Sequence, residues 1–217
     1  MTTLTTSLKK GGIVLLDPTN GSLQRIIVFQ YNPDTLTRTL KIEEVEDSKN
    51  GRARALKLKG PPVETFKVDV EIDATAKPDF LDRSSEVAKI GIFPDLYSLE
   101  TIVYPKAADL QEKKSKANSG KIEIAPTDAP ITLFVWGENR IMPVKITDMT
   151  VTEEAFDPDL NPIRAKVSLG MKVLSVSDVG FKHKISDLYL TYHRNKEGLA
   201  ARSRSGTFGE LGITGIP

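Results

Sequence analysis

The sequence contains no cysteine, only two histidines and a single tryptophan. The absence of cysteine excludes a disulfide framework, thiolate metal sites and cysteine nucleophiles. Thirty basic residues against 29 acidic ones give a net charge of +1, whereas nonspecific nucleic-acid binding needs a basic surplus. We therefore expect no nucleic-acid partner.

Long hydrophobic runs are missing as well. No stretch approaches the roughly 18 apolar residues that a membrane-spanning helix needs. The first residues, MTTLTTSLKKGG, lack the apolar centre of a secretory signal. The sequence thus predicts a soluble protein that is made in the cytoplasm and has no membrane partner.

Groups able to carry out catalysis are scarce. A Ser–His–Asp triad or a histidine-based metal site would have to use His183 or His193. Both lie in the segment HKISDLYLTYHR, which is typical of a polar, solvent-exposed helix. No dinucleotide, nucleotide-phosphate, metalloprotease or serine-hydrolase motif occurs. The sequence therefore predicts a protein that is not an enzyme, with no catalytic, cofactor-binding or metal-binding residues and no cofactor.

Apolar and polar residues alternate with a period of two along much of the chain, as in strands with one buried face. Residues 66–73 alternate with mainly acidic residues, and residues 164–173 repeat the pattern with basic ones. In residues 142–149 the alternation loses phase at Thr147, which a β-bulge or a register change at a strand end explains equally well. The unbroken apolar run at 24–30 favours a strand covered on both faces.

A long charged hairpin is predicted over about residues 35–59. Asn50-Gly51 is a strong signal for a tight hairpin turn. Counting outward from this turn sets opposite charges across from each other, and we expect the hairpin to reach out from the core. The predicted pairs are Asp47 with Arg54, Val45 with Leu56 and Glu44 with Lys57.

Two short helices and two irregular segments complete the prediction. Residues 94–102 have a proline at the start and an acid in the first turn, and residues 184–194 form a second helix. The lysine-rich stretch at about 106–121 is typical of a flexible, solvated loop. Residues 195–217 are rich in glycine and are expected to form an arm that orders on a partner.

The strand expected at residues 131–137 is apolar on both faces and holds Trp136. One face fits a core. The other needs a second cover, because the chain lacks the alternating helices of a parallel α/β sheet. That cover is either the helix near 96–102 or a neighbouring subunit.

Several short patches resemble, in this order, the N-terminal tube-like domain of contractile injection system baseplate proteins, which are relatives of phage tail components. Their order and spacing over about residues 24–175 carry the resemblance. They are FQYNP at 29–33 with Leu36 and Arg38 behind it, GPP at 60–62 before the 66–73 strand, the helix at 95–102, the strand at 130–137 ending in Trp-Gly, and FDPDLNPIRA at 156–165.

The resemblance implies a mainly β subunit, a β-barrel or β-sandwich of the phage tail-tube type, that assembles into a hexameric ring. Such a ring lies between the spike or hub protein and the inner tube protein, as an adaptor or tube initiator, and acts by stacking without bond chemistry. It would assemble in the bacterial cytoplasm and then become part of an injection particle. The repeating inner tube subunit is an alternative, and a monomeric β-rich enzyme or ligand-binding protein is a third.

The tube-like β domain is expected over residues 1–178, followed by a C-terminal helix and arm over 179–217. Many relatives carry a LysM peptidoglycan-binding module, but its motif is missing after Ser175. Glycan binding is therefore not implied. The arm is instead expected to dock onto a sheath, tube or baseplate-wedge component, or to lie disordered.

The alternating charges offer contacts between subunits. Arg164 begins the last strand on its solvent side, where an acid of the 66–73 strand can pair with it. The charged faces either line a lumen, meet across subunits or form an ordinary solvated sheet surface. The acids available to Arg164 are Asp69, Glu71 and Asp73. The inter-subunit interface candidates are Asp47, Arg54, Lys57, Asp69, Glu71, Arg164, Lys166 and Trp136.

Overall fold

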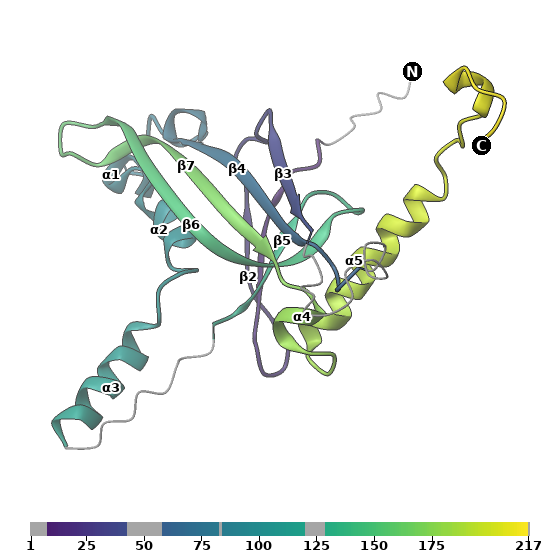
Figure 1. Cartoon of the computed structure of the whole chain (residues 1–217). Helices are drawn as coiled ribbons and strands as arrows, with labels where there is room; N and C mark the ends of the chain where they lie inside the picture. The colour runs from purple at the N-terminus through teal and green to yellow at the C-terminus, as the bar shows by residue number, and fades with distance from the viewer. Residues whose placement is uncertain (1–7, 43–57, 83, 120–128, 217) are drawn as a thin grey trace, which may run out of the picture.

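The computed structural model describes residues 8–42, 58–82, 84–119 and 129–216 (Figure 1). The strands in these ranges are β1 (Gly12–Leu16), β2 (Leu23–Val28), β3 (Leu36–Lys41), β4 (Val63–Asp73), β5 (Ile131–Val135), β6 (Ile141–Phe156) and β7 (Pro162–Val173). The helices are α1 (Glu86–Ile90), α2 (Phe93–Glu100), α3 (Ala107–Asn118), α4 (Val176–Val179) and α5 (Lys184–Ala200), with 3-10 turns η1 (Ala74–Ala76) and η2 (Phe208–Leu211).

The strands form one sheet in the order β2-β1-β5-β6-β7-β4-β3, and each neighbouring pair is antiparallel. Within the described residues, β2 and β3 are the two edges, so the sheet is not a closed barrel. The prediction of a mainly β fold is confirmed. The longest strands, β6 and β7, lie side by side near the middle of the sheet (Figure 1).

Three phenylalanines mark the core. Phe66 of β4 and Phe134 of β5 have ring centroids 5.9 Å apart, although their strands are not neighbours in the sheet. Phe29, just after β2, lies 6.4 Å from Phe134. These contacts require the sheet to curl over its own core, and aromatic pairs at this separation contribute about 0.5–1.5 kcal/mol each beyond their buried area.

A β-bulge keeps Met149 and Val151 of β6 on the core side of the sheet. The pairing with β7 skips Thr147, between Ile146 and Asp148. Because of this extra residue, Met149 and Val151 pack against the core just as Ile146 does. Of the two explanations for the loss of phase at Thr147, the bulge is confirmed.

Helix α2 confirms the prediction of a helix at 94–102. Pro94 lies in its first turn, where the missing N–H has no helical partner to lose. Leu96 and Leu99 are buried in the core. The helix pair α1–α2 is fixed to the start of β7 because the Ile92 N–H donates to the Pro162 carbonyl at 2.8 Å.

The lysine-rich stretch at about 106–121 is largely helical, so the prediction of a loop was wrong. Helix α3 covers most of it, and none of the helix's side chains is buried. Alanine, leucine, glutamine, glutamate and lysine are good helix formers. An ion pair between Glu112 and Lys116, 2.9 Å apart and one turn along, adds local support. High charge and helix formation are therefore compatible here.

The apolar run at 24–30 is not covered on both faces, and this prediction was also wrong. Strand β2 is an edge strand, in which Leu23, Ile26 and Val28 keep 58%, 56% and 57% of their surface exposed. Ile27 points to the opposite face and packs against the core. An apolar edge strand borders only one neighbour, so its outward side chains need a cover from elsewhere.

The second apolar face of the 131–137 strand is covered by the chain's own C-terminal helix. Ile131 and Leu133 of β5 pack with Ile185 of α5 in a cluster separate from the main core. The cover is thus neither the helix near 96–102 nor a neighbouring subunit, the two possibilities considered from the sequence. Among the described helices, none is long and apolar enough to cross a membrane.

Candidate assembly surfaces

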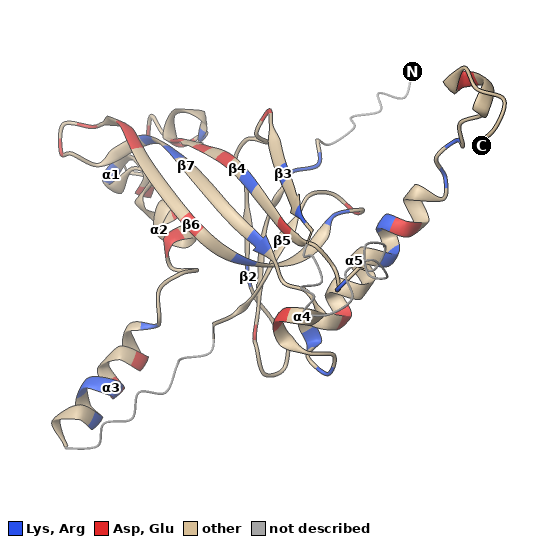
Figure 2. Ribbon diagram, in the orientation of Figure 1, with Lys and Arg blue, Asp and Glu red and all other residues tan. Residues whose placement is uncertain are grey.

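The outer face of the sheet, opposite the core, has two different parts. Over β1 and β5 it is apolar and covered by α5, whereas over β4, β7 and the rest of β6 it carries charged and polar side chains (Figure 2). We call this second part the polar face. Its residues are Lys67, Asp69, Glu71, Asp73, Lys145, Asp148, Thr150, Thr152, Arg164, Lys166, Ser168 and Lys172.

Asp73 is the acid that pairs with Arg164. The two residues are opposite each other in the β4–β7 register, and Nε and Nη2 of Arg164 both lie 3.0 Å from Asp73 Oδ2. Burial raises the pKa of Asp73, but hydrogen bonds from Thr75 and the Arg164 guanidinium lower it more, so the pKa lies below the ordinary 3.8. This pair joins the two strands at one end of the polar face.

The other predicted charges of these strands are exposed on the polar face. The register sets Glu71 opposite Lys166 and Asp69 opposite Ser168, and both acids and the lysine face solvent. They are therefore placed to meet another chain or a water-filled channel. The hairpin candidates lie outside the described residues: Asp47, Arg54 and Lys57.

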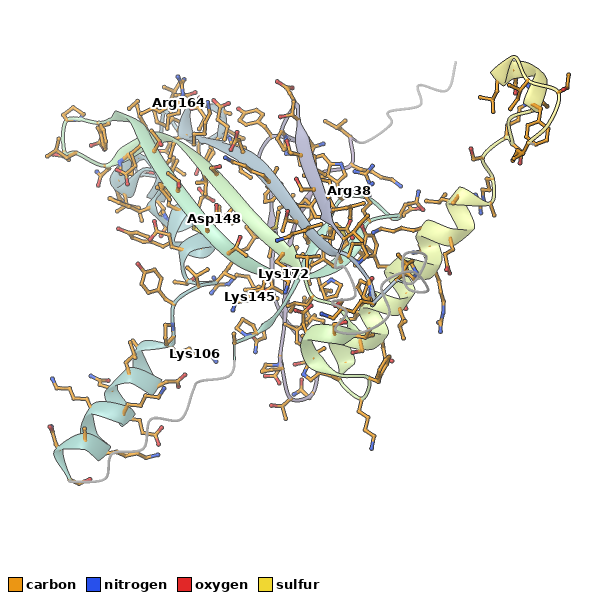
Figure 3. The ribbon with its side chains drawn as sticks, in the orientation of Figure 1. Arg38, Lys106, Lys145, Asp148, Arg164 and Lys172 are labelled. Atoms are coloured by element: carbon orange, nitrogen blue, oxygen red, sulfur yellow. The ribbon has the colours of Figure 1, made fainter. Side chains whose placement is uncertain are left out.

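Like charges gather at the opposite end of the polar face from Asp73. Lys145 of β6 lies directly across from Lys172 of β7 (Figure 3). Lys172 also donates a hydrogen bond to Asp178 of α4 at 2.6 Å, and this ion pair fixes α4 to the sheet. The polar face therefore carries acids on β4 and a basic end near the C-terminal helices.

Trp136 is half-buried and packs within its own chain. Its ring centroid lies 6.0 Å from that of Phe134. The ring also covers Gly11 so closely that a Cβ at Gly11 would come within 2.5 Å of it. Much of the indole therefore stabilises the fold, and a contact between Trp136 and a neighbouring subunit remains a prediction.

Two amide side chains of the FQYNP patch act as substitutes for a neighbouring strand. Gln30 Nε2 donates to the Asp73 carbonyl at 2.8 Å, and Gln30 Oε1 accepts from the Asp73 N–H at 2.9 Å. Asn32 bridges the Lys9 carbonyl and the Gly11 N–H in the same way, at 2.8 and 2.9 Å. The patch thus fastens the segment after β2 to the end of β4 and the start of β1. In the sequence, only the proline of this patch indicated a turn.

The FDPDLNP patch builds the turn between β6 and β7. Asp157 Oδ1 accepts the N–H groups of Asp159 and Asn161, both at 2.8 Å. Asn161 Nδ2 donates to the Lys89 carbonyl of α1 at 3.1 Å, which ties the turn to the helices. Leu160 has a left-handed φ of 64° and is 77% exposed. The turn therefore presents an apolar side chain at the end of the longest hairpin.

A buried carboxylate, Glu64, anchors α5 to the start of β4. It is only 3% exposed and accepts hydrogen bonds from the Tyr192 hydroxyl at 2.9 Å and from Lys196 Nζ at 2.6 Å. Arg38 Nη1 lies 3.8 Å from it (Figure 3). Burial and the Glu64 charge raise the pKa of Tyr192 far above its ordinary value. The sequence pattern did not indicate a role for Glu64, although Glu64 points to the same side of β4 as Phe66.

The two histidines of α5 differ in their surroundings. His183 Nδ1 accepts the Ile185 N–H at 3.1 Å and so caps the start of the helix. His193 is half-exposed, and its ring stacks on Tyr189 with centroids 6.1 Å apart. Among the described residues, no group of three or more His, Asp or Glu side chains is placed to hold a metal ion.

A cavity of about 280 Å³ lies between β2 and α2. Arg25 of β2 holds the two elements together by donating to Thr101 Oγ1 at 3.0 Å. At the rim, Lys77 forms an ion pair with Asp95. Small-molecule sites usually have volumes of about 300–1,000 Å³, so this cavity suits one or two side chains better. Its apolar lining includes Ile27, Val28, Val70, Ile72, Pro78 and Leu99.

The patches that carried the resemblance are therefore structural parts of one domain. The family model described as contractile injection system tube protein matches residues 8–178, which is most of the chain. This chain belongs to the contractile injection system tube protein family. The resemblance inferred from the patches is confirmed, and the family is one of structural proteins.

Solved structures of gene transfer agent particles are also similar to this tube protein. The tail of an empty particle is 13% identical, and a native virion is 12% identical. Each comparison covers 75% of this chain and 90% of the other, with a TM-score of 0.28. No curated protein matches the chain.

The C-terminal helix lies beyond the family match but belongs to the fold of this tube protein. The match ends at residue 178, within α4. Helix α5 begins six residues later, and it buries Ile185, Ser186, Tyr189 and Tyr192. The side chains that anchor α5 come from β4 and β5, well inside the matched region. This chain therefore carries a packed helix beyond the part that the family model matches.

Proposed function

We propose that this member of the tube family is a structural subunit that forms a hexameric ring between the spike or hub and the inner tube. The ring acts as an adaptor or tube initiator, without catalysis. The polar face carries this proposal, because it is exposed across β4, β7 and β6 and has a continuous apolar core behind it. In a ring such a face suits the wall of a water-filled channel, where charges of both signs remain hydrated.

The two unlike edges of the sheet support assembly through side-by-side contacts. The sheet ends at β3 beside the polar face and at β2 on the other side, where Ile26 and Val28 are exposed. An exposed apolar edge is a template for pairing with another chain. Contacts between unlike surfaces generate a ring when the rotation closes. The resemblance supplies the expected number of six.

The family description itself favours a second candidate, the repeating subunit of the inner tube. Both candidates stack rings along one axis, and they differ in copy number. An adaptor occurs once, as six chains per particle end, whereas a tube subunit recurs along the whole particle. In either case we expect assembly in the bacterial cytoplasm before the particle is complete. The third candidate, a monomeric ligand-binding protein, has little support, because the cavity holds only about 280 Å³.

The test is the mass of the purified chain in solution, measured by light scattering alone and in a mixture with the spike or hub. We expect a species of six chains of 23.9 kDa each. Ile26→Lys places a charge on the β2 edge and should block assembly, whereas Leu81→Lys, at a residue 89% exposed on a turn, is the matched control. A chain that stays monomeric in both conditions would contradict the ring.

Quantitative mass spectrometry of purified particles then separates the two ring candidates. Six copies per particle support the adaptor, and a number that grows with particle length supports the tube subunit. Imaging of the particle tip gives an independent check, because an adaptor ring lies at one level only.

A further inference from the structure

The segment after α5 carries apolar side chains in a defined local fold. Around η2 the Thr207 N–H donates to Glu210 Oε2 at 2.7 Å, and the Glu210 N–H donates to Thr207 Oγ1, which together form a capping box. Gly212 has a left-handed φ of 70°, and the Ile213 N–H donates back to the Phe208 carbonyl at 3.1 Å. We call this segment the apolar tip; its apolar residues are Phe208, Leu211, Ile213 and Ile216.

The apolar tip is exposed in the described part of the chain. Phe208, Leu211, Ile213 and Ile216 keep 47%, 73%, 44% and 79% of their surface accessible. Helix α5 leaves the body after Lys196, and it carries the tip to the side of the molecule away from α1 and α2 (Figure 1). A segment with a fixed fold loses little entropy on binding. It is therefore well suited to insert into another surface.

The cavity between β2 and α2 has the properties that such a tip requires. It holds about 280 Å³ and has a mainly apolar lining. Val28 contributes both to this lining and to the exposed edge of β2, where it is 57% exposed, so the cavity continues into an apolar surface. Because α5 points away from α2, the tip cannot reach the cavity of its own chain (Figure 1).

The segments that carry the cavity wall and the tip have opposite net charges. The stretch at 77–100, which contains α1 and α2 and contributes to the cavity wall, has five acids against three bases: Asp79, Asp82, Glu86, Asp95 and Glu100 against Lys77, Arg83 and Lys89. The arm that leads to the tip carries Arg202 and Arg204, both exposed, and the tip adds only Glu210. Opposite potentials steer the encounter and disfavour wrong partners.

We propose that the apolar tip of one copy docks into the β2–α2 cavity of a neighbouring copy. The partner is thus a second copy of this chain, in place of the sheath or wedge component expected from the sequence. The contact joins unlike surfaces at opposite sides of the molecule, so it links copies head to tail and strengthens a closed ring. This inference rests on the proposed ring, in which neighbouring copies are present.

Disulfide trapping tests the contact directly, because the chain has no cysteine of its own. Ser98 lines the cavity and Leu211 belongs to the tip. The full-length Ser98→Cys and Leu211→Cys chains are mixed and oxidised with diamide. We expect a disulfide-linked dimer that contains one chain of each kind. Leu8→Cys mixed with Ser98→Cys is the matched control, since Leu8 is 75% exposed and Leu211 73%.

Two further readouts keep the test decisive. Phe208→Asp should weaken association between wild-type-length chains by at least about tenfold, measured by dilution in sedimentation. In assembled particles, a photo-crosslinker attached to the cysteine of Leu211→Cys should label a second copy of this chain. Labelling of a sheath or wedge chain instead would overturn the docking proposal.

Failure of the tip to dock and failure of the ring to form give different results. Chains that form six-subunit rings without the mixed disulfide would overturn the docking of the tip and leave the ring intact. In a chain that carries both Ser98→Cys and Leu211→Cys, a disulfide that forms only within single chains would also overturn it. Chains that stay monomeric with and without the spike would count against the proposed function itself.

Discussion

Helices α3 and α5 both project from the same sheet, and they depend on it to very different degrees. Helix α3 has 12 residues and buries none of them. Helix α5 has 17 residues, and four side chains in its first nine residues are buried. Both are polar on average and rich in charge. The difference lies in the positions of a few side chains, since the buried residues of α5 follow one another at intervals of one, three and three.

The comparison shows that a helix anchored by buried side chains and a helix without buried side chains can have similar compositions. The anchor of α5 has an apolar part, around Ile185 and Tyr189, and a charged part, at Glu64. In helix α3, the ion pair between Glu112 and Lys116 lies on the surface. Such surface pairs contribute about 0–1 kcal/mol. Substitutions of the side chains that anchor α5 should therefore change stability, and substitutions in α3 should not.

The largest expected effect comes from removing the buried carboxylate. Glu64→Ala leaves Lys196 and the Tyr192 hydroxyl without their shared acceptor, and we expect a loss of about 3 kcal/mol in the free energy of unfolding. Urea denaturation followed by circular dichroism measures it. The control is Glu197→Ala, an exposed acid on α5, with an expected change below about 0.5 kcal/mol. Equal effects of both variants would refute the anchor.

A smaller loss is expected when the ring of Tyr192 stays and only its hydroxyl is removed. Tyr192→Phe keeps the packing but deletes the hydrogen bond to Glu64, so we expect about 1.5–2 kcal/mol. Combining it with Glu64→Ala should add almost nothing, because the hydrogen bond is already lost. A double-mutant cycle by urea denaturation checks this coupling, and strict additivity would show that the two groups act independently.

The ion pair before α5 should make stability depend on pH. Burial raises the pKa of Asp178, but the Lys172 ammonium and the N–H and hydroxyl of Ser175 lower it more, so the pKa lies below 3.8. A depressed pKa stabilises the fold above the pKa of the unfolded chain, and this contribution is lost as pH falls through the folded pKa. Asp178→Asn should therefore cost about 1 kcal/mol at pH 7 and progressively less below pH ~4.

Denaturation between pH 7 and 2.5 measures this effect. The matched control on α3 is Glu112→Gln, because the pKa of Glu112 is lowered by Lys116 in a fully exposed pair. We expect no measurable change in the pH dependence for that variant. If the free energies of unfolding of wild type and Asp178→Asn differ by the same amount from pH 7 to 2.5, a charge-dependent anchor is refuted.

The smallest effect is expected on α3 itself. Leu110 is its largest apolar residue and is 51% exposed. Leu110→Ala removes no buried contact, so we expect a change in the free energy of unfolding below about 0.5 kcal/mol. The comparison on α5 is Ile185→Val, at a residue 8% exposed, with an expected loss of about 1 kcal/mol. A larger loss at Leu110 would mean that α3 packs against the body in solution.

Local patterns in the sequence predicted the centre of the fold well. The alternation at 66–73 and 164–173 identified β4 and β7, and α2 was also correctly identified. The bulge was one of the two explanations that the sequence left open. These features depend on neighbours along the chain. The pairing of Arg164 with Asp73 in particular needed the register between two strands far apart in sequence. The pattern limited the choice to three acids but could not decide among them.

Features that depend on distant contacts were harder to predict. The apolar run of β2 looks like a buried strand, since sequence does not show which strand has only one neighbour. The cover of β5 by α5 joins residues about 50 positions apart. A signal for it was present, because Ile185, Leu188, Tyr189 and Tyr192 recur at helical spacing. The amide bridges of Gln30 and Asn32 left no such pattern.

The bulge at Thr147 also limits how this gene can vary in length. Before the bulge, the core-facing residues of β6 have even numbers, such as Ile146, and after it they have odd ones, such as Met149 and Val151. Deleting the codon for Thr147 itself would remove the extra residue and leave Ile146, Met149 and Val151 on the core face, whereas deleting the codon between Met149 and Val151 would turn the residues beyond it to the opposite face. A one-codon deletion in β6 should therefore be tolerated at Thr147 and not between Met149 and Val151.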